Sequence, residues 1–176
     1  MDDVASFGHD GIVKRLLALD DAVQGLIKNG DVPIVVVGGA ALILQGLTRP
    51  DRLTSIIDFI EAPMEAIGRM GGLDMNNAAA TFSLMMPYGW RERVQTIPTQ
   101  TSAIRVETPS AADLCIMKLT SGRDRDLADV LSALEMRPDL RTQISTILSD
   151  PLELQVNVSE VDWDRIRESA AALGIP

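Results

Sequence analysis

Residues 32–46 read VPIVVVGGAALILQG, and this stretch decides the fold. The run that ends at Val37 is β-branched and apolar without alternation, which predicts a strand buried on both faces. Gly38 and Gly39 follow directly, and residues 40–45 then predict a short helix. A strand, a glycine turn and a helix in immediate succession indicate an α/β protein.

The glycine pair has two explanations. Glycine lets a helix start close against its strand and leaves backbone N–H groups open to an anion. Close packing alone is the more common reason for glycine in such a turn. The stretch is not a phosphate-binding P-loop, because no Gly-Lys-Ser/Thr follows, and it lacks the three glycines of the dinucleotide fingerprint.

A second buried strand is predicted at residues 56–60, Ile-Ile-Asp-Phe-Ile. Alternation places Ile56 and Asp58 on the same face of this strand. A carboxylate in a buried strand costs free energy unless it is paired, hydrogen-bonded or bound to a metal. Asp58 therefore either opens on a ligand cleft or has a structural role, in which it caps a neighbouring loop or pairs with Arg49 or Arg52.

The rest of the chain predicts helices around this pair of strands. Residues 11–28 carry apolar side chains at helical spacing, with Asp20 among the charged residues on the surface. Residues 74–91 predict partial helix followed by loop, and Pro98 lies in a turn between two short strands. Those strands are expected at 94–97 and 103–106, and further helices at 63–70, 108–119, 124–136, 141–148 and 159–174.

Length and composition predict one globular domain over residues 1–176, and its last part is expected to form the C-terminal helices at 138–174. The chain has 176 residues, of which 46% are apolar and only 3% aromatic. The core is therefore expected to consist of Leu, Ile, Val, Ala and Met. A Met-rich surface would also support a homodimer.

Charge and rare residues exclude several classes of protein. A net charge of −9 opposes binding to duplex DNA, because the phosphate backbone would be repelled. Cys115 is the only cysteine and His9 the only histidine, which excludes an internal disulfide and a two-histidine metal site. An acidic N-terminus and the lack of long apolar runs predict a cytoplasmic protein without a membrane anchor.

Residues 118–129 hold six charges in twelve positions. Asp126 and Asp129 lie one helical turn apart, and the composition favours a solvated helix face whose charges pair with one another. Lys118 differs, because it lies in an otherwise apolar helix. Its ammonium group must therefore extend to solvent or meet an anion.

Four blocks of the sequence together resemble the nucleotidyltransferase superfamily, which has the polymerase-β-like fold. The closer resemblance is to small bacterial proteins related to the AbiEii-type toxins, which carry Gly-Gly-Ala-Ala-Leu and then Arg-x-Thr-x-Asp-Ile-Asp. The resemblance covers about residues 30–135, which would be the core of the domain, and its first two blocks begin at Gly38 and at Arg52. Residues 84–94 (LMMPYGWRERV) and 113–130 (DLCIMKLTSGRDRDLADV) resemble two further motifs of these proteins.

The resemblance implies a mixed sheet flanked by helices and a metal-dependent transfer of a nucleoside monophosphate from a nucleoside triphosphate. The acceptor would be an RNA end, a protein side chain or a small hydroxyl compound. Asp58 would hold Mg²⁺ and act with Lys118 in catalysis. The nucleotide-binding residues by the same resemblance are Gly38, Gly39, Thr54, Arg123, Asp126 and Asp129.

One position departs from the family pattern. Ile56 stands where the family has its first metal-binding aspartate, and isoleucine offers no oxygen ligand. Asp51, Glu92 and Glu107 are only nominal replacements for the missing acids. The sequence thus supports two hypotheses, a nucleotidyltransferase weakened at its metal site or a degenerate module that binds a nucleotide or a partner protein without turnover.

Overall fold

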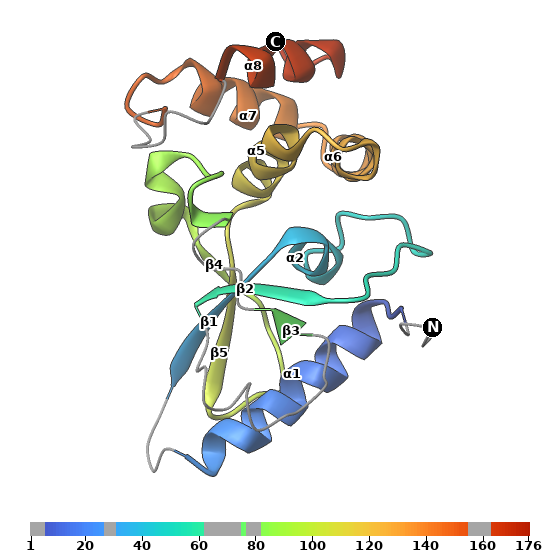
Figure 1. Cartoon of the computed structure of the whole chain (residues 1–176), viewed down its shortest axis with the longest axis vertical. Coiled ribbons are helices and arrows are strands. Elements are labelled where there is room, and N and C mark those ends of the chain that lie inside the picture. The colour runs from blue at the N-terminus through green and yellow to red at the C-terminus, as the bar shows by residue number, and fades with distance from the viewer. Residues whose placement is uncertain (1–5, 27–30, 62–74, 77–81, 155–162) are drawn as a thin grey trace.

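The computed structural model describes residues 6–26, 31–61, 75–76, 82–154 and 163–176. A five-stranded mixed sheet in the order β3-β2-β1-β5-β4 forms its centre (Figure 1). This confirms the predicted class, a mixed sheet flanked by helices. The strands are β1 (Val32–Val37), β2 (Ile57–Glu61), β3 (Met75–Asn76), β4 (Gln95–Thr96) and β5 (Ile104–Thr108).

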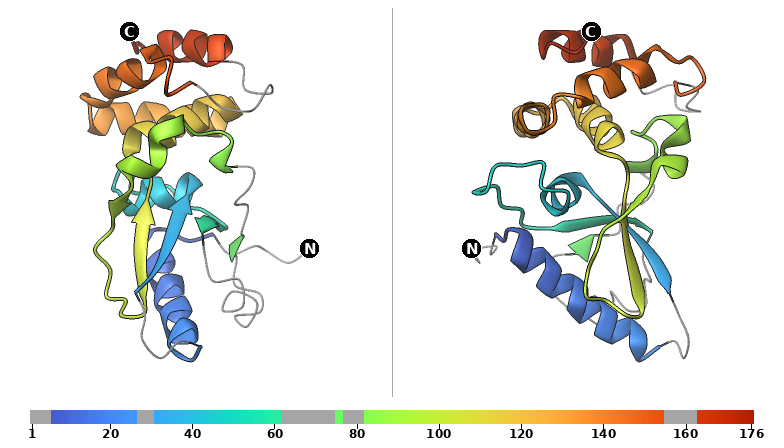
Figure 2. Two further views of the ribbon diagram at one scale, coloured as in Figure 1. Left: turned by 90° about the vertical axis from the view of Figure 1, so that its left-hand side faces the viewer. Right: turned by 180° about the vertical axis from the view of Figure 1, so that it is seen from behind.

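Strand β1 is the middle of the sheet. It runs parallel to β5 and antiparallel to β2, and the parallel pair is visible side by side in Figure 2. The register pairs Val37 at the end of β1 with Asp58 near the start of β2. The glycine turn after β1 and the acid of β2 are therefore adjacent, although about twenty positions of sequence separate them.

Helices cover the sheet on one side and extend beyond one end of it. α1 (His9–Gln24) and α2 (Gly38–Leu44) lie on the same side of the sheet (Figure 1). The other helices gather beyond the carboxyl ends of β1 and β5 (Figure 2). They are the short 3₁₀ helix η1 (Tyr88–Arg93) and α5 (Ala111–Ser121), α6 (Asp124–Met136), α7 (Leu140–Ser149) and α8 (Trp163–Ala172).

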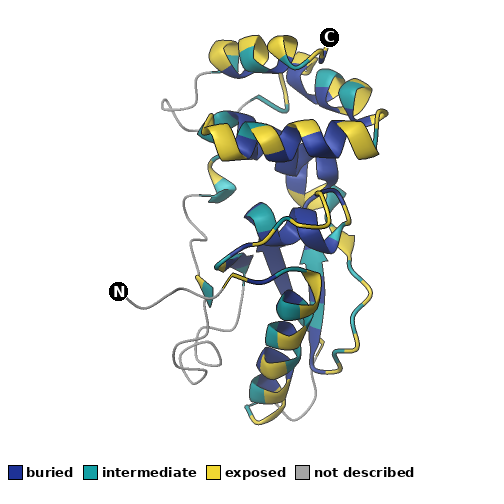
Figure 3. Ribbon diagram, turned by 90° about the vertical axis from the view of Figure 1, so that its right-hand side faces the viewer, coloured by how far each residue is buried: buried dark blue, intermediate teal, exposed yellow. Residues whose placement is uncertain are grey.

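The core is almost entirely aliphatic, as the composition predicts. Ile12, Leu16 and Leu19 of α1 are fully buried, and so are Ile34 of β1 and Leu114 of α5. Figure 3 shows the buried residues concentrated where the helices face the sheet and one another. No described helix is long and apolar enough to cross a membrane.

Several boundaries differ from the sequence predictions. α2 already begins at Gly38, and β2 begins at Ile57, so Ile56 precedes the strand. Thr108 belongs to β5, and the cap of α5 is the Ser110 side chain, which accepts a hydrogen bond from the Asp113 N–H. A 3₁₀ helix occupies 88–93, where a loop was expected at the end of 74–91. The predicted helix at 63–70 lies outside the described residues.

Asp20 is buried, which corrects its prediction as a surface residue. Its carboxylate accepts hydrogen bonds from the backbone N–H groups of Ser102, Ala103 and Ile104 at 2.7–3.0 Å. Burial raises the pKa of Asp20, but these hydrogen bonds outweigh it and hold the pKa below its usual value. The side chain thereby ties α1 to the start of β5.

We expect Asp20→Asn to lower the free energy of unfolding by roughly 1.5–3 kcal/mol, because hydrogen bonds to a charged acceptor are lost. The folded pKa is depressed, so this contribution is full above about pH 4 and is lost as the pH falls through the folded pKa. Chemical denaturation of both proteins at neutral and acidic pH measures the difference. Exposed Asp21 gives the control Asp21→Asn, and equal losses from both variants would contradict the assignment.

Candidate functional site

A pocket of about 430 Å³ opens at the point where β1 ends and β2 begins. Gly38 and Gly39 of α2 line it together with Asp58 of β2, Lys118 of α5 and Arg123, which precedes α6. These residues are distant in the sequence, and the antiparallel β1–β2 pair and the crossover from β5 to α5 bring them together. The remaining lining residues are Phe82, Met85, Met117, Thr120 and Ser121.

The glycine turn lies close to two functional side chains. Gly38 has φ = +68°, and a Cβ added there would lie 3.1 Å from Asp58 Oδ2. A Cβ on Gly39 would lie 2.9 Å from Arg52 Nη2. At Gly38 the positive φ disfavours any larger residue. At Gly39 a larger residue would require the Arg52 guanidinium group to move. Packing accounts for the pair, and both glycines also line the pocket.

Asp58 faces the pocket and is half-buried. Its Oδ1 accepts a hydrogen bond of 3.0 Å from Asn76 Nδ2 on β3. Burial raises the pKa of Asp58, while the Asn76 amide and the positive charges of Lys118 and Arg123 offset only part of that increase. Of the two interpretations of this residue, the structure supports the carboxylate that opens on a cleft.

Lys118 is buried in a network of charges. Its Nζ lies 2.6 Å from Asp126 Oδ1 and 2.8 Å from Asp129 Oδ2. Asp126 also accepts hydrogen bonds from Ser121 Oγ at 2.7 Å and Arg123 Nε at 2.6 Å. Burial raises the pKa of Asp126, but these donors together lower it to about 2. The ammonium group therefore meets anions, which was one of the two expectations for it.

The two aspartates do not form the solvated helix face that the composition favours. Both are only 4% exposed, and each is bonded to groups outside α6. Asp129 binds Arg52 in a bidentate pair, with Nε–Oδ1 at 2.7 Å and Nη2–Oδ2 at 2.8 Å. Arg52 is thus the partner of Asp129 rather than of Asp58, and it links α6 to the Gly39 turn.

Thr54 and Ile56 lie outside the lining of this pocket. The Thr54 hydroxyl donates to the Ile56 carbonyl at 2.9 Å, and its backbone pairs with Phe7. Ile56 is 36% exposed. The resemblance implies that Thr54 binds the nucleotide, but the structure places it outside the pocket lining, with its hydroxyl bonded within the turn before β2.

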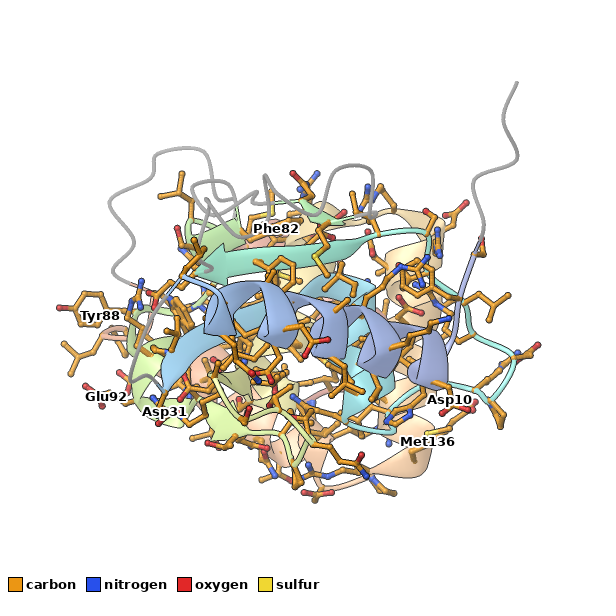
Figure 4. The ribbon with its side chains drawn as sticks, turned by 90° about the horizontal axis from the view of Figure 1, so that it is seen from below. Asp10, Asp31, Phe82, Tyr88, Glu92 and Met136 are labelled. Atoms are coloured by element: carbon orange, nitrogen blue, oxygen red, sulfur yellow. The ribbon has the colours of Figure 1, made fainter. Side chains whose placement is uncertain are left out.

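The described residues contain no group of three or more His, Cys, Asp or Glu side chains that could hold a metal ion. Asp58 is the one carboxylate among the described lining residues of the pocket. Glu92 is exposed and lies at the edge of the molecule (Figure 4), and Glu107 pairs with Arg105 at 2.7 Å. Neither nominal acid reaches the pocket.

A second ionic network joins two of the blocks that carry the resemblance. Arg93 of η1 binds the fully buried Asp113 of α5, with Nη2–Oδ1 at 2.7 Å and Nε–Oδ2 at 3.0 Å. It also binds Glu153, which follows α7. No role was predicted for Arg93 or Asp113, although they lie in the motifs at 84–94 and 113–130. They fix η1 against the helix that carries Lys118.

The mixed sheet, the glycine turn and the acid on the adjacent strand agree with the nucleotidyltransferase-like arrangement that the resemblance implies. Residues 14–169 match the model of a family described as "Nucleotidyltransferase of unknown function (DUF6036)". The chain therefore belongs to this family, which confirms the resemblance seen in the sequence. No curated protein and no solved structure matches the chain.

We expect Lys118→Met to lower the free energy of unfolding by about 3 kcal/mol, because two buried carboxylates then lack their shared cation. Denaturant unfolding at neutral pH measures this loss. Adding Asp126→Asn to Lys118→Met should restore part of the stability, since it removes one of the two like charges. The exposed lysine of α1 provides the control Lys14→Met. Wild-type stability of Lys118→Met would contradict the buried pairing.

Proposed function

We propose that this pocket binds a nucleoside triphosphate as its Mg²⁺ complex and transfers the nucleoside monophosphate to an acceptor hydroxyl. In this reaction the acceptor oxygen bonds to the α-phosphorus, the bond to the bridging oxygen breaks, pyrophosphate leaves and the hydroxyl proton passes to water. The proposal rests chiefly on one observation: Gly38, Asp58, Lys118 and Arg123 line the same pocket. Membership of the family supports a nucleotide as the substrate.

Each side chain has a role that follows from its surroundings. Gly38 and Gly39 carry no side chain, so a phosphate can approach their backbone closely. Arg123 keeps 74% of its side chain exposed and offers donors to phosphate oxygens. Lys118 is held by two carboxylates, so it contributes fixed positive charge at the pocket wall rather than a mobile ammonium group.

The carboxylates near the pocket suit one Mg²⁺ ion better than two. Mg²⁺ keeps several waters and is commonly held by one or two carboxylates together with substrate phosphates. Asp58 supplies one such carboxylate, which suits an ion that arrives on the triphosphate and screens its charge. A pair of ions held by the protein does not fit, because Ile56 provides no oxygen. We therefore propose slow transfer.

The single carboxylate among the described lining residues of the pocket favours a second candidate function, nucleotide binding without turnover. Binding the Mg²⁺ complex of a nucleotide needs fewer protein groups than transfer does, because transfer also requires the acceptor and the leaving group to be aligned. An RNA end or a protein side chain remains our proposal for the acceptor of the first candidate. Transfer of label from α-labelled nucleotide distinguishes the two candidates.

We expect Ile56→Asp to strengthen Mg²⁺-dependent ATP binding by about tenfold or more, because it restores a second oxygen ligand two residues from Asp58. Calorimetry with ATP, GTP, CTP and UTP, with and without Mg²⁺, measures the gain. Ile56 is exposed, so the new carboxylate is not buried. The control is Leu152→Asp, which changes a leucine that is 64% exposed and does not line this pocket. An equal effect of both variants would contradict a metal ligand at residue 56.

We expect Asp58→Asn to weaken binding of the Mg²⁺–ATP complex by about tenfold or more and to leave stability at pH 7 unchanged or higher. The folded pKa of Asp58 is raised, so the charged carboxyl disfavours folding increasingly as the pH rises from about 4 through that pKa. Wild-type affinity for the Mg²⁺ complex should rise over the same interval. Calorimetry and thermal unfolding across pH test both effects.

Asp10→Asn serves as the control for this variant, because it removes one exposed carboxylate from the start of α1. A large loss of stability in Asp58→Asn would show a structural role for the carboxylate. Unchanged binding of the Mg²⁺ complex would remove Asp58 from the proposed site.

A further inference from the structure

A second pocket of about 360 Å³ lies between the segment that precedes β2 and one face of α6. Its volume is in the range of small-molecule sites. Figure 3 faces α6, along which buried and exposed residues alternate. The pocket is lined by Thr48, Arg49, Asp51, Arg52, Leu53, Arg125, Ala128, Asp129, Leu131, Ser132 and Glu135. Gly38, Asp58 and Lys118 line only the first pocket.

Ser132 gives this pocket a buried polar group that needs a partner. The residue is 5% exposed, and its hydroxyl has no hydrogen-bond partner among the described residues. A serine within a helix commonly donates to the carbonyl four residues earlier, but this one does not. A buried hydroxyl without a partner costs free energy.

The arginines of the pocket differ in what they already bind. Arg52 uses its guanidinium group on Asp129 and on the Leu53 carbonyl. Arg125 donates to the same carbonyl through Nη2 at 2.9 Å, and its other donors have no acceptor among the residues that the structure describes. The Arg49 side chain has no hydrogen bond or ion pair with any residue that the structure describes. Two guanidinium groups are therefore available to a ligand.

The other lining groups narrow the chemistry of that ligand. Asp51 and Glu135 are exposed carboxylates that no described side chain pairs with, so they can accept hydrogen bonds from hydroxyl or amino groups. Leu53 and Leu131 are 45% and 41% exposed and offer apolar surface. A simple anion would be repelled by the two carboxylates, whereas a neutral ligand would leave the arginines without a partner.

We propose that this second pocket binds a nucleoside monophosphate. Guanidinium groups match the oxygens of a terminal phosphate, which places that phosphate at Arg49 and Arg125. The base packs against the two leucines, and the sugar hydroxyls or the amino group of the base donate to Asp51 or Glu135. This site is separate from the proposed triphosphate site. Arg52 and Asp129 form part of the wall of the second pocket.

The test is a titration of the ¹⁵N-labelled protein with AMP in the presence of EDTA, followed by amide chemical shifts. AMP should move the amide signals of residues 128–132 and Leu53 in a saturable manner. Arg49→Gln and Arg125→Gln should each weaken that response by about tenfold or more. Both arginines are exposed, so the fold is retained. Arg167→Gln on α8 is the matched control and should leave the affinity unchanged.

Adenosine and inorganic phosphate serve as the two partial ligands, and each should bind at least tenfold more weakly than AMP. Phosphate that binds as well as AMP, or adenosine that does so, would overturn the assignment of a nucleotide. Shifts confined to Gly38 and Gly39, or no saturation at all, would overturn the second pocket as a site. The assay contains neither Mg²⁺ nor triphosphate, so its outcome is independent of the transfer reaction.

Discussion

The ammonium group of Lys118 lies between the carboxylates of Asp126 and Asp129, and the shape of the site depends on this buried pairing. Removing three charges from water is expensive, and their mutual attraction compensates only with close contacts. The contacts at 2.6 and 2.8 Å meet that requirement. Through Asp129 the same network includes Arg52, which lies beside the Gly39 turn, so α5 and α6 are tied to the segment that precedes β2.

This network pairs two of the acidic side chains near the pocket with cations. The chain carries a net charge of −9, yet both buried aspartates near the pocket are already neutralised by cations. Asp58 is different, because its only described hydrogen-bond donor is the Asn76 amide and burial raises its pKa. A carboxylate that is costly to the fold and faces a pocket is typical of a functional group.

Ile56 separates this chain from the pattern of the family it resembles. An exposed isoleucine before β2 costs the fold little, so stability does not require an aspartate there. A one-carboxylate pocket is consistent with an ion that is brought by the phosphates. The second pocket is lined by the same Arg52–Asp129 pair, and in our proposals this pair lies between the monophosphate site and the triphosphate site.

The sequence by itself indicated most of the local elements and singled out Gly38, Asp58 and Lys118, which line the first pocket. The β-branched run before Gly38 predicts β1, and the lone acid in an apolar strand marks Asp58, because both signals arise from neighbouring residues. Only the tertiary structure decided which charges pair. The Arg52–Asp129 bond and the burial of Asp20 join residues 77 to 84 positions apart, and local spacing contains no information on such contacts. A charged residue in a predicted helix is expected to be solvated when only its own segment is considered. Whether it is buried depends on how the helices and strands pack together.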